Sequence, residues 1–164
     1  MIAQNAALQR PDLVRKLVIV GSGPERDRLQ QCARQAGVVE DFVWKAATAD
    51  IAAWLRNFDI FVLPSRSEAF PNSVMEAMAC QCAVVASNVG GVPELVQDAA
   101  TGLLFQPGRP AELAAALRRL MENPELRQTL AAAGERFVRE HLSRQASAER
   151  MAEIYTAAIE KHGC

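Results

Sequence analysis

The sequence lacks a large net charge of either sign, a long apolar run and a recognisable secretory leader. Its 18 lysines and arginines nearly balance 19 aspartates and glutamates, which gives a formal net charge of −1, so no overall field attracts it to DNA or RNA. No apolar run approaches the roughly 20 residues of a membrane-spanning helix. The first residues show neither the charged region nor the apolar core of a signal peptide. We therefore expect a cytoplasmic protein that binds no nucleic acid, and attachment to the inner face of the membrane through another domain stays open.

The sequence is also short of metal-ligating side chains. It has four cysteines and two histidines. Cys80 and Cys82 form a C-x-C pair, but no second pair is present, and His141 and His162 lie far away in the sequence. Cysteine-based metal sites usually need two such pairs or a histidine close to one of them. We therefore predict free, reduced thiols, no metal site and no cofactor.

Short apolar segments alternate with helical ones along the chain, whose 164 residues are enough for one domain. The predicted strands are rich in β-branched residues and apolar on both faces, as in a buried parallel sheet; they cover residues 17–20, 42–44, 59–64, 83–86 and 102–105. The predicted helices cover residues 25–36, 49–57, 72–81, 111–122, 124–142 and 143–161. This alternation is typical of a doubly wound, Rossmann-like α/β fold.

Two glutamates, Glu68 and Glu76, stand on either side of a predicted helix start. Ligands of α/β sheets bind beyond the carboxyl ends of the strands, and the free N–H groups of this helix's first turn, on Asn72, Ser73 and Val74, would attract an anion. A carboxylate can accept hydrogen bonds from two neighbouring hydroxyls. One glutamate could therefore hold a ribose and the other a sugar ring, with phosphates between them.

The spacing of the two glutamates leaves a second interpretation open. Both would then be surface residues near a helix start, where acidic side chains are common. A phosphate site also needs a nearby cation, and the loop before the helix contains only Arg66. The residues of this segment alone therefore do not decide between a ligand site and a solvated surface.

Two glycine turns follow predicted strands. Gly21 and Gly23 are similar in spacing to the dinucleotide motif G-x-G-x-x-G, but Arg26 stands where close helix packing needs a small residue. This departure argues against an NAD-dependent enzyme, and a tight turn is the simpler interpretation. Gly90 and Gly91 follow the strand over residues 83–86. They either let a backbone approach a ligand closely or form a plain turn.

The order of these motifs carries a family resemblance over nearly the whole chain. The matching runs are Ile19-Val20-Gly21-Ser22-Gly23-Pro24, Asp59-Ile60-Phe61-Val62-Leu63-Pro64-Ser65, Ser67-Glu68-Ala69-Phe70-Pro71, Glu76-Ala77-Met78-Ala79, Val84-Val85-Ala86, Gly90-Gly91-Val92-Pro93-Glu94 and Thr101-Gly102-Leu103-Leu104. Together they resemble the C-terminal, donor-binding domain of retaining glycosyltransferases with the GT-B fold, in particular glycosyltransferase family 4, also called glycosyl transferases group 1.

The resemblance implies roles for individual residues. Glu68 corresponds to the first glutamate of the family's E-x7-E motif, beside the donor sugar, and is the expected catalytic residue. Glu76 corresponds to the second, which binds ribose hydroxyls. The other residues expected at the donor site are Gly21, Gly23, Phe70 and, through their amides on the diphosphate, Asn72, Ser73 and Val74. The implied reaction transfers a sugar from a nucleoside diphosphate with retention and without a metal, as in polysaccharide or glycolipid biosynthesis.

Three features depart from the family's pattern. Gln81 and Ala46 stand where glycine is usual, at the end of the motif helix and in the loop that faces the base. Before Leu17, nothing resembles the family's first strand or the Arg and Lys that neutralise the diphosphate. In the strand order 3-2-1-4-5-6 that strand is central and would lie between strands 17–20 and 59–64. Either these two strands close together, a partner supplies the strand, or the chain is a piece of a longer protein.

We therefore expect residues 1–164 to form an N-terminally truncated domain that binds a nucleotide-sugar donor and is inactive without an acceptor-binding domain. The resemblance implies that the helix over residues 143–164 packs back toward that acceptor domain. The alternative is a non-catalytic interaction module that keeps the fold, has lost nucleotide binding and dimerises through unpaired sheet strands.

Overall fold

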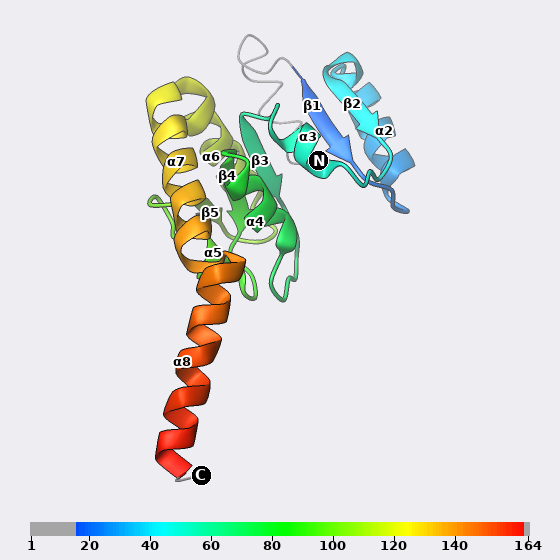
Figure 1. The fold of residues 1–164 in the computed structure, drawn as a ribbon. Coiled ribbons are helices and arrows are strands. Elements are labelled where there is room, and N and C mark those ends of the chain that lie inside the picture. The colour runs from blue at the N-terminus through cyan, green and yellow to red at the C-terminus, as the bar shows by residue number, and fades with distance from the viewer. Residues whose placement is uncertain (1–15, 163–164) are drawn as a thin grey trace.

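A computed structural model describes residues 16–162 of the protein, in which every predicted strand and helix is present. The elements are β1 (Leu17–Val20), α2 (Arg26–Gln35), the 3-10 helix η1 (Val39–Asp41), β2 (Phe42–Lys45), α3 (Ile51–Leu55), β3 (Ile60–Leu63), α4 (Asn72–Ala79), β4 (Ala83–Ser87), α5 (Val92–Leu95), β5 (Leu103–Phe105), α6 (Pro110–Glu122), α7 (Pro124–His141) and α8 (Arg144–His162) (Figure 1). α3 begins later than predicted because the Asp50 carboxylate accepts a hydrogen bond from the Ala53 N–H (3.3 Å) and caps its first turn.

The strands form two parallel sheets rather than one. β1 pairs with β2 in the first sheet, and β3, β4 and β5 pair in that order in the second. No ladder joins β1 to β3 among the residues that the structure describes, and Figure 1 shows the two sheets side by side. The described strands therefore follow the order of a doubly wound sheet that is divided where the central strand was predicted. Strands β1 and β3 do not close together.

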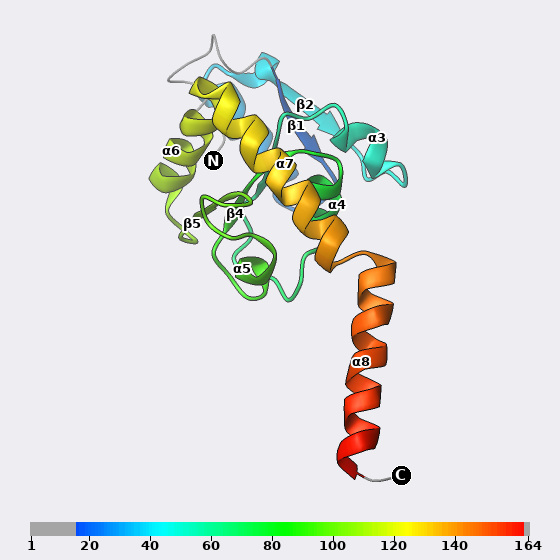
Figure 2. The ribbon, with the colours of Figure 1, turned by 60° about the vertical axis from the view of Figure 1, so that its left-hand side comes forward.

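The core of the larger sheet lies around β4, whose residues are all buried. Because side chains alternate across a strand, Ala83 and Val85 face one way and Val84 and Ala86 face the other. The first pair packs against leucines of α6 and α7. The second pair packs against apolar side chains of α3, α4 and α5. Helices therefore cover both faces of this sheet (Figure 2), and the loops after β3 and β4 remain at its carboxyl edge.

Helix α8 extends away from the rest of the chain in both views (Figures 1 and 2). Its large apolar side chains Met151, Ile154, Tyr155 and Ile159 are 51–63% exposed. Contiguous exposed apolar side chains of this kind commonly mark an interaction surface. That this helix packs on an acceptor domain stays a prediction. Within residues 16–162, no helix combines the length and the hydropathy that crossing a membrane requires.

Helix α4 ends earlier than predicted, at Ala79, in a Schellman motif. The Gln81 N–H donates to the Met78 carbonyl (3.0 Å), and the Cys82 N–H donates to the Ala77 carbonyl (3.0 Å). This pattern requires the left-handed conformation at Gln81, whose φ is 60°. A residue with a Cβ is strained there, whereas glycine is not. Gln81, which stands where the family usually has glycine, is therefore the residue of this turn whose backbone conformation favours glycine.

Replacing Gln81 with glycine is expected to raise the free energy of unfolding by about 1 kcal/mol, because the left-handed conformation carries no Cβ penalty in glycine. Urea denaturation of the two proteins measures the difference. Gln128→Gly is the matched control, since Gln128 is an exposed glutamine inside α7. The control should lose about 1 kcal/mol. A loss of stability in Gln81→Gly as well would contradict the assignment.

Candidate functional site

The predicted site residues come mainly from one segment, which runs from the end of β3 into α4. Glu68 lies in the loop between them and is partly buried, while Glu76 lies in α4 and is exposed. Phe70, in the same loop, is 43% exposed. The segment emerges at the carboxyl edge of the three-stranded sheet, the edge at which α/β proteins bind ligands.

A chain of hydroxyl groups anchors Glu68 to β4. The Ser65 hydroxyl donates to Oε1 of Glu68 (2.6 Å). The Ser87 hydroxyl donates in turn to the Ser65 carbonyl (2.6 Å). Ser87 is 0% exposed and ends β4, so it gives the loop a fixed support inside the sheet. The carboxylate of Glu68 is therefore tied through Ser65 to the buried end of β4. Sequence patterns did not reveal Ser87, because it acts through a contact with a loop that is distant in the sequence. Ser65 lies only three residues before Glu68, but its spacing did not single it out.

The second glycine turn packs directly against the loop that carries Glu68. The Gly91 N–H donates to the Ala69 carbonyl (3.0 Å). Gly90 has a φ of +50°, and a Cβ added to it would overlap the carbonyl oxygen of Glu68. A Cβ on Gly91 would likewise overlap the Ala69 carbonyl. The glycines thus permit this turn to approach the backbone of Glu68 and Ala69 closely. Their close approach to a ligand stays a prediction.

The N-terminus of α4 keeps donors without an acceptor in the described part of the chain. Pro71 is its N-cap, with no side-chain capping bond, and the first turn contains no acidic residue. Asn72 and Ser73 precede the first N–H that can bond within the helix. The third predicted amide, that of Val74, is different, because it donates to the Pro71 carbonyl (3.1 Å). Of the three amides predicted to bind an anion, only those of Asn72 and Ser73 therefore remain without an acceptor among the described residues.

The first glycine turn lies at the end of β1, in the other sheet. Gly21 has a φ of +128° and donates its N–H to the Lys45 carbonyl (3.0 Å). No described atom lies within 4 Å of a Cβ added to Gly21 or to Gly23. The space above both glycines is therefore open, unlike that at Gly90 and Gly91. The structure does not bring Gly21 or Gly23 into contact with Glu68 or Glu76.

A cavity of about 630 Å³ joins the loops that follow β1 and β3. Its lining consists of Glu25 and Arg28, at the start of α2, and Arg66, in the loop after β3. The sequence pointed to Arg66 as the cation of its own loop, but it did not indicate Arg28, which is distant in the chain. The cavity shows that the carboxyl edges of the two sheets face a common space.

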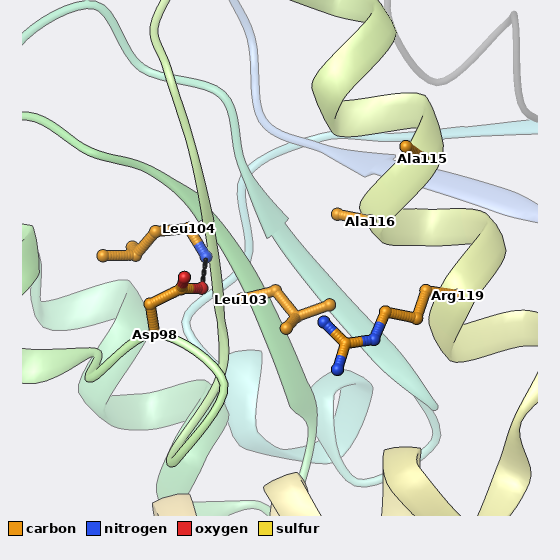
Figure 3. A pocket seen from close by; sticks show the side chains of 6 residues that line it. All are labelled: Asp98, Leu103, Leu104, Ala115, Ala116 and Arg119. Atoms are coloured by element: carbon orange, nitrogen blue, oxygen red, sulfur yellow. Dashed lines mark hydrogen bonds between the residues drawn. The ribbon is translucent and has the colours of Figure 1, made fainter.

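A second cavity, of about 240 Å³, lies between β5 and α6 (Figure 3). Leu103, Ala115 and Ala116 line it together with Asp98 and Arg119. The Asp98 carboxylate already accepts a hydrogen bond from the Leu104 N–H (2.9 Å), which provides an acceptor for one backbone donor of the edge strand β5. None of the predicted site residues lines this cavity, and none lines the larger cavity either. We therefore separate both cavities from the candidate site, although Arg66 of the larger one lies on the loop that carries Glu68.

Three cysteines, Cys32, Cys80 and Cys82, lie within the described residues. Cys82 is buried, its thiol donates to the Leu55 carbonyl (3.1 Å), and burial raises its pKa to about 12. Such a thiol stays neutral and unreactive at ordinary pH. Cys32 and Cys80 are also free thiols. Within residues 16–162 no group of His, Cys, Asp and Glu is arranged to hold a metal ion.

Comparison with known proteins identifies the family. The model of the glycosyl transferases group 1 matches residues 2–137. The chain belongs to this family. A D-inositol 3-phosphate glycosyltransferase of Thermomonospora curvata is 36% identical over 141 residues, which cover 84% of this chain and 32% of the relative. One from Paenarthrobacter aurescens is 33% identical over 126 residues, covering 74% and 31%. The chain thus spans about a third of the length of these curated relatives.

Solved structures of group 1 glycosyltransferases and related proteins share the fold. Anabaena HepE in complex with UDP has a TM-score of 0.85 and 26% identity, and the match covers 95% of this chain and 44% of HepE. The C-terminal domain of the group 1 protein LpcC from Francisella tularensis has a TM-score of 0.78 and 28% identity, covering 87% and 78%. The predicted Rossmann-like half of a GT-B fold is therefore confirmed.

Proposed function

We propose that this chain is the donor-binding portion of a glycosyltransferase that takes a sugar from a nucleoside diphosphate. The observation that carries the proposal is the start of α4. Free amides of Asn72 and Ser73 lie there between Glu68, held in place by Ser65, and the exposed Glu76. Support comes from HepE, a structural neighbour with 26% identity, which was solved in complex with UDP and with UDP-glucose.

In this proposal the amides at the α4 N-terminus receive the diphosphate, because they combine unpaired donors with the positive end of the helix dipole. Glu76 accepts hydrogen bonds from the ribose hydroxyls, and Glu68 lies beside the donor sugar. As the diphosphate leaves, its growing charge is stabilised by these fixed donors rather than by a metal ion. Retention of the anomeric configuration and the metal-independent mechanism belong to the proposal through the family resemblance.

The acceptor-binding residues are proposed to lie on a separate domain, without which the chain transfers no sugar. The relatives are about three times as long as the matched region, which leaves room for such a domain. The exposed apolar side chains of α8 offer a surface for it. We also propose that the protein works in the cytoplasm, where the full-length form could bind the inner face of the membrane.

A non-catalytic interaction module is the second candidate. It is favoured by the division of the sheet, which leaves β1 and β3 without a ladder between them in the described residues. Unpaired strand edges readily pair with another chain. This candidate differs from the first in predicting dimers and no affinity for nucleotides.

Calorimetric titration of the chain with UDP, ADP and GDP tests the choice between the two candidates. We expect saturable binding of at least one nucleoside diphosphate, and weaker binding of the corresponding nucleoside, which lacks phosphates. Gel filtration at the same concentrations reports the oligomeric state. No binding of any of the three at millimolar concentration, together with a stable dimer, would reject donor binding and favour the interaction module.

A further inference from the structure

We propose that Asp98 and Glu112 close the outer edge of β5 against pairing with a second copy of this chain. β5 ends the three-stranded sheet, so one side of it has no neighbouring strand among the described residues. Such an edge presents backbone N–H and C=O groups with which another chain can pair. The two carboxylates occupy the donors of this edge, and without them β5 becomes an interface between two copies. This role is independent of donor binding.

The backbone groups that face outward from β5 follow from its pairing with β4. The Asn88 N–H donates to the Phe105 carbonyl (2.8 Å), so the backbone groups of Phe105 point toward β4. Successive residues of a strand direct their N–H and C=O groups to opposite sides. The groups of Leu104 and Gln106 therefore point away from the sheet. These are the groups with which an added strand would pair.

Both outward donors already have a carboxylate as their acceptor. The Leu104 N–H donates to Oδ1 of Asp98 (2.9 Å), and the Gln106 N–H donates to Oε2 of Glu112 (2.8 Å). These two contacts, the edge caps, come from the loop before β5 and from the first turn of α6. Hydrogen bonds to an ionised acceptor are stronger than those between neutral groups. The backbone carbonyl of an incoming strand therefore competes with a better acceptor at each donor.

The loop before β5 positions Asp98 beside the edge. The Ala99 N–H donates to the Gly102 carbonyl (2.8 Å), and Asp98 forms an isolated parallel bridge with Gly102. Ala99 has a φ of 58°, so the chain turns back on β5 through a residue in the left-handed conformation. The Thr101 hydroxyl accepts a hydrogen bond from the Gln97 N–H (2.9 Å) and closes the loop. The backbone of this loop therefore sets the position of the Asp98 cap.

Helix α6 does not close the edge by itself. The cavity of about 240 Å³ reaches Leu103 and Leu104 of β5 on one side and Ala115 and Arg119 of α6 on the other (Figure 3). Figure 3 also shows the hydrogen bond between Asp98 and the Leu104 N–H at this cavity. An incoming strand therefore has room to approach β5, and the edge caps are the contacts that it would have to displace.

A second copy of the chain fits this edge because β5 is self-complementary. Leu104 is the middle residue of β5 (Leu103–Phe105), and its N–H and C=O groups face outward. In an antiparallel pair, residues that lie directly opposite each other can exchange both hydrogen bonds. Leu104 of one copy can therefore bond Leu104 of the other about a two-fold axis, which gives a closed dimer. In the unchanged chain, the same approach would bring the Asp98 and Glu112 carboxylates of both copies to one edge, where like charges repel.

The test is sedimentation equilibrium of the 164-residue chain and its variants over a range of protein concentrations. Asp98→Ala/Glu112→Ala should associate more than the unchanged chain, with a weight-average mass that rises by up to about twofold as a closed pair forms. Asp98→Asn/Glu112→Gln keeps an oxygen acceptor at both positions and should have the mass of the unchanged chain. Asp27→Ala/Glu140→Ala, which removes one exposed aspartate and one exposed glutamate, is the matched control for the lost charge and should also leave the mass unchanged.

Adding Leu104→Pro to the double-alanine variant identifies the associating surface. Proline has no N–H, and the N–H lost here points away from β4, so the ladder between β4 and β5 keeps its hydrogen bonds. This triple variant should return to the mass of the unchanged chain. Association through β1, β3 or α8 would not respond to the change. Association that persists in the triple variant would therefore overturn the proposal.

Equal masses of the double-alanine variant and the unchanged chain at every concentration would overturn the proposal as well. Circular dichroism checks that each variant is folded. If the double-alanine variant does not fold, Asp98→Ala alone exposes the Leu104 donor and should show the same rise of mass with concentration. A folded Asp98→Ala variant with the mass of the unchanged chain would then count against the edge caps in the same way.

Discussion

Replacing Gly90 with alanine is expected to lower the free energy of unfolding by about 2–4 kcal/mol. Two effects add. The φ of +50° is strained for any residue with a Cβ, and the new methyl group would overlap the carbonyl oxygen of Glu68. A side chain could rotate away from such a contact, but a backbone carbonyl cannot. The loop that carries Glu68 must therefore move, or the turn after β4 must open.

Gly108→Ala is the matched control for this prediction. Gly108 has a φ of +75°, but no described atom lies within 4 Å of a Cβ added to it. The control therefore carries the conformational strain without the overlap and should lose only about 1 kcal/mol. Urea denaturation of the two variants isolates the contribution of the contact. Equal losses in both would show that Gly90 serves its own turn alone and does not hold the loop.

The same variant has a consequence for the site. Movement of the Glu68 backbone would lengthen the 2.6 Å hydrogen bond from the Ser65 hydroxyl, because Ser65 stays tied to β4 through Ser87. The Glu68 carboxylate would then lose its tie to β4. The glycine turn after β4 therefore supports the backbone of the candidate catalytic residue.

The fold followed from local patterns to a large extent. The β-branched run of β4 between turn residues, Pro110 and Pro124 at helix starts and the Gly37 stop after α2 all indicated elements that the structure confirms. The division of the sheet was not predicted, because the family's strand order left open whether the strands now seen as β1 and β3 would close together; in the described residues they belong to separate sheets. Helix ends were less well predicted. The length of α4 depends on the left-handed conformation of Gln81, a residue that sequence patterns do not expect in that role.

The site was predicted only in part, for a physical reason. Glu68, Glu76 and the first amides of α4 share one segment, so their spacing in the sequence carries the information. Ser87, in contrast, reaches the Glu68 loop from β4. The spacing of neighbouring residues does not predict contacts between segments that are far apart in the chain. The contact between Gly90 and the backbone of Glu68 was not predicted for the same reason.

Glu76→Ala is expected to weaken UDP binding by about 1.5–3 kcal/mol, or roughly ten- to a hundredfold, since ribose hydroxyls would lose a charged acceptor. Uridine binding should fall as well, because uridine carries the same ribose, while pyrophosphate binding should not change. Calorimetric titration measures all three. Glu140→Ala, which removes an exposed glutamate from α7, should bind as the unchanged chain does. Unchanged UDP affinity in Glu76→Ala would rule out the ribose role.

Replacing Glu68 should affect sugar transfer and not nucleotide binding, because the proposed partner of Glu68 is the sugar rather than the nucleotide. Glu68→Gln keeps an oxygen that can accept the Ser65 hydrogen bond, so the loop should keep its shape and UDP should bind unchanged. Sugar transfer by the full-length enzyme should nevertheless fall by at least about a hundredfold, since the negative charge beside the reacting centre is lost. Loss of UDP binding in Glu68→Gln would show that the two glutamates do not divide the donor between them. Near-normal transfer would remove Glu68 from the catalytic role.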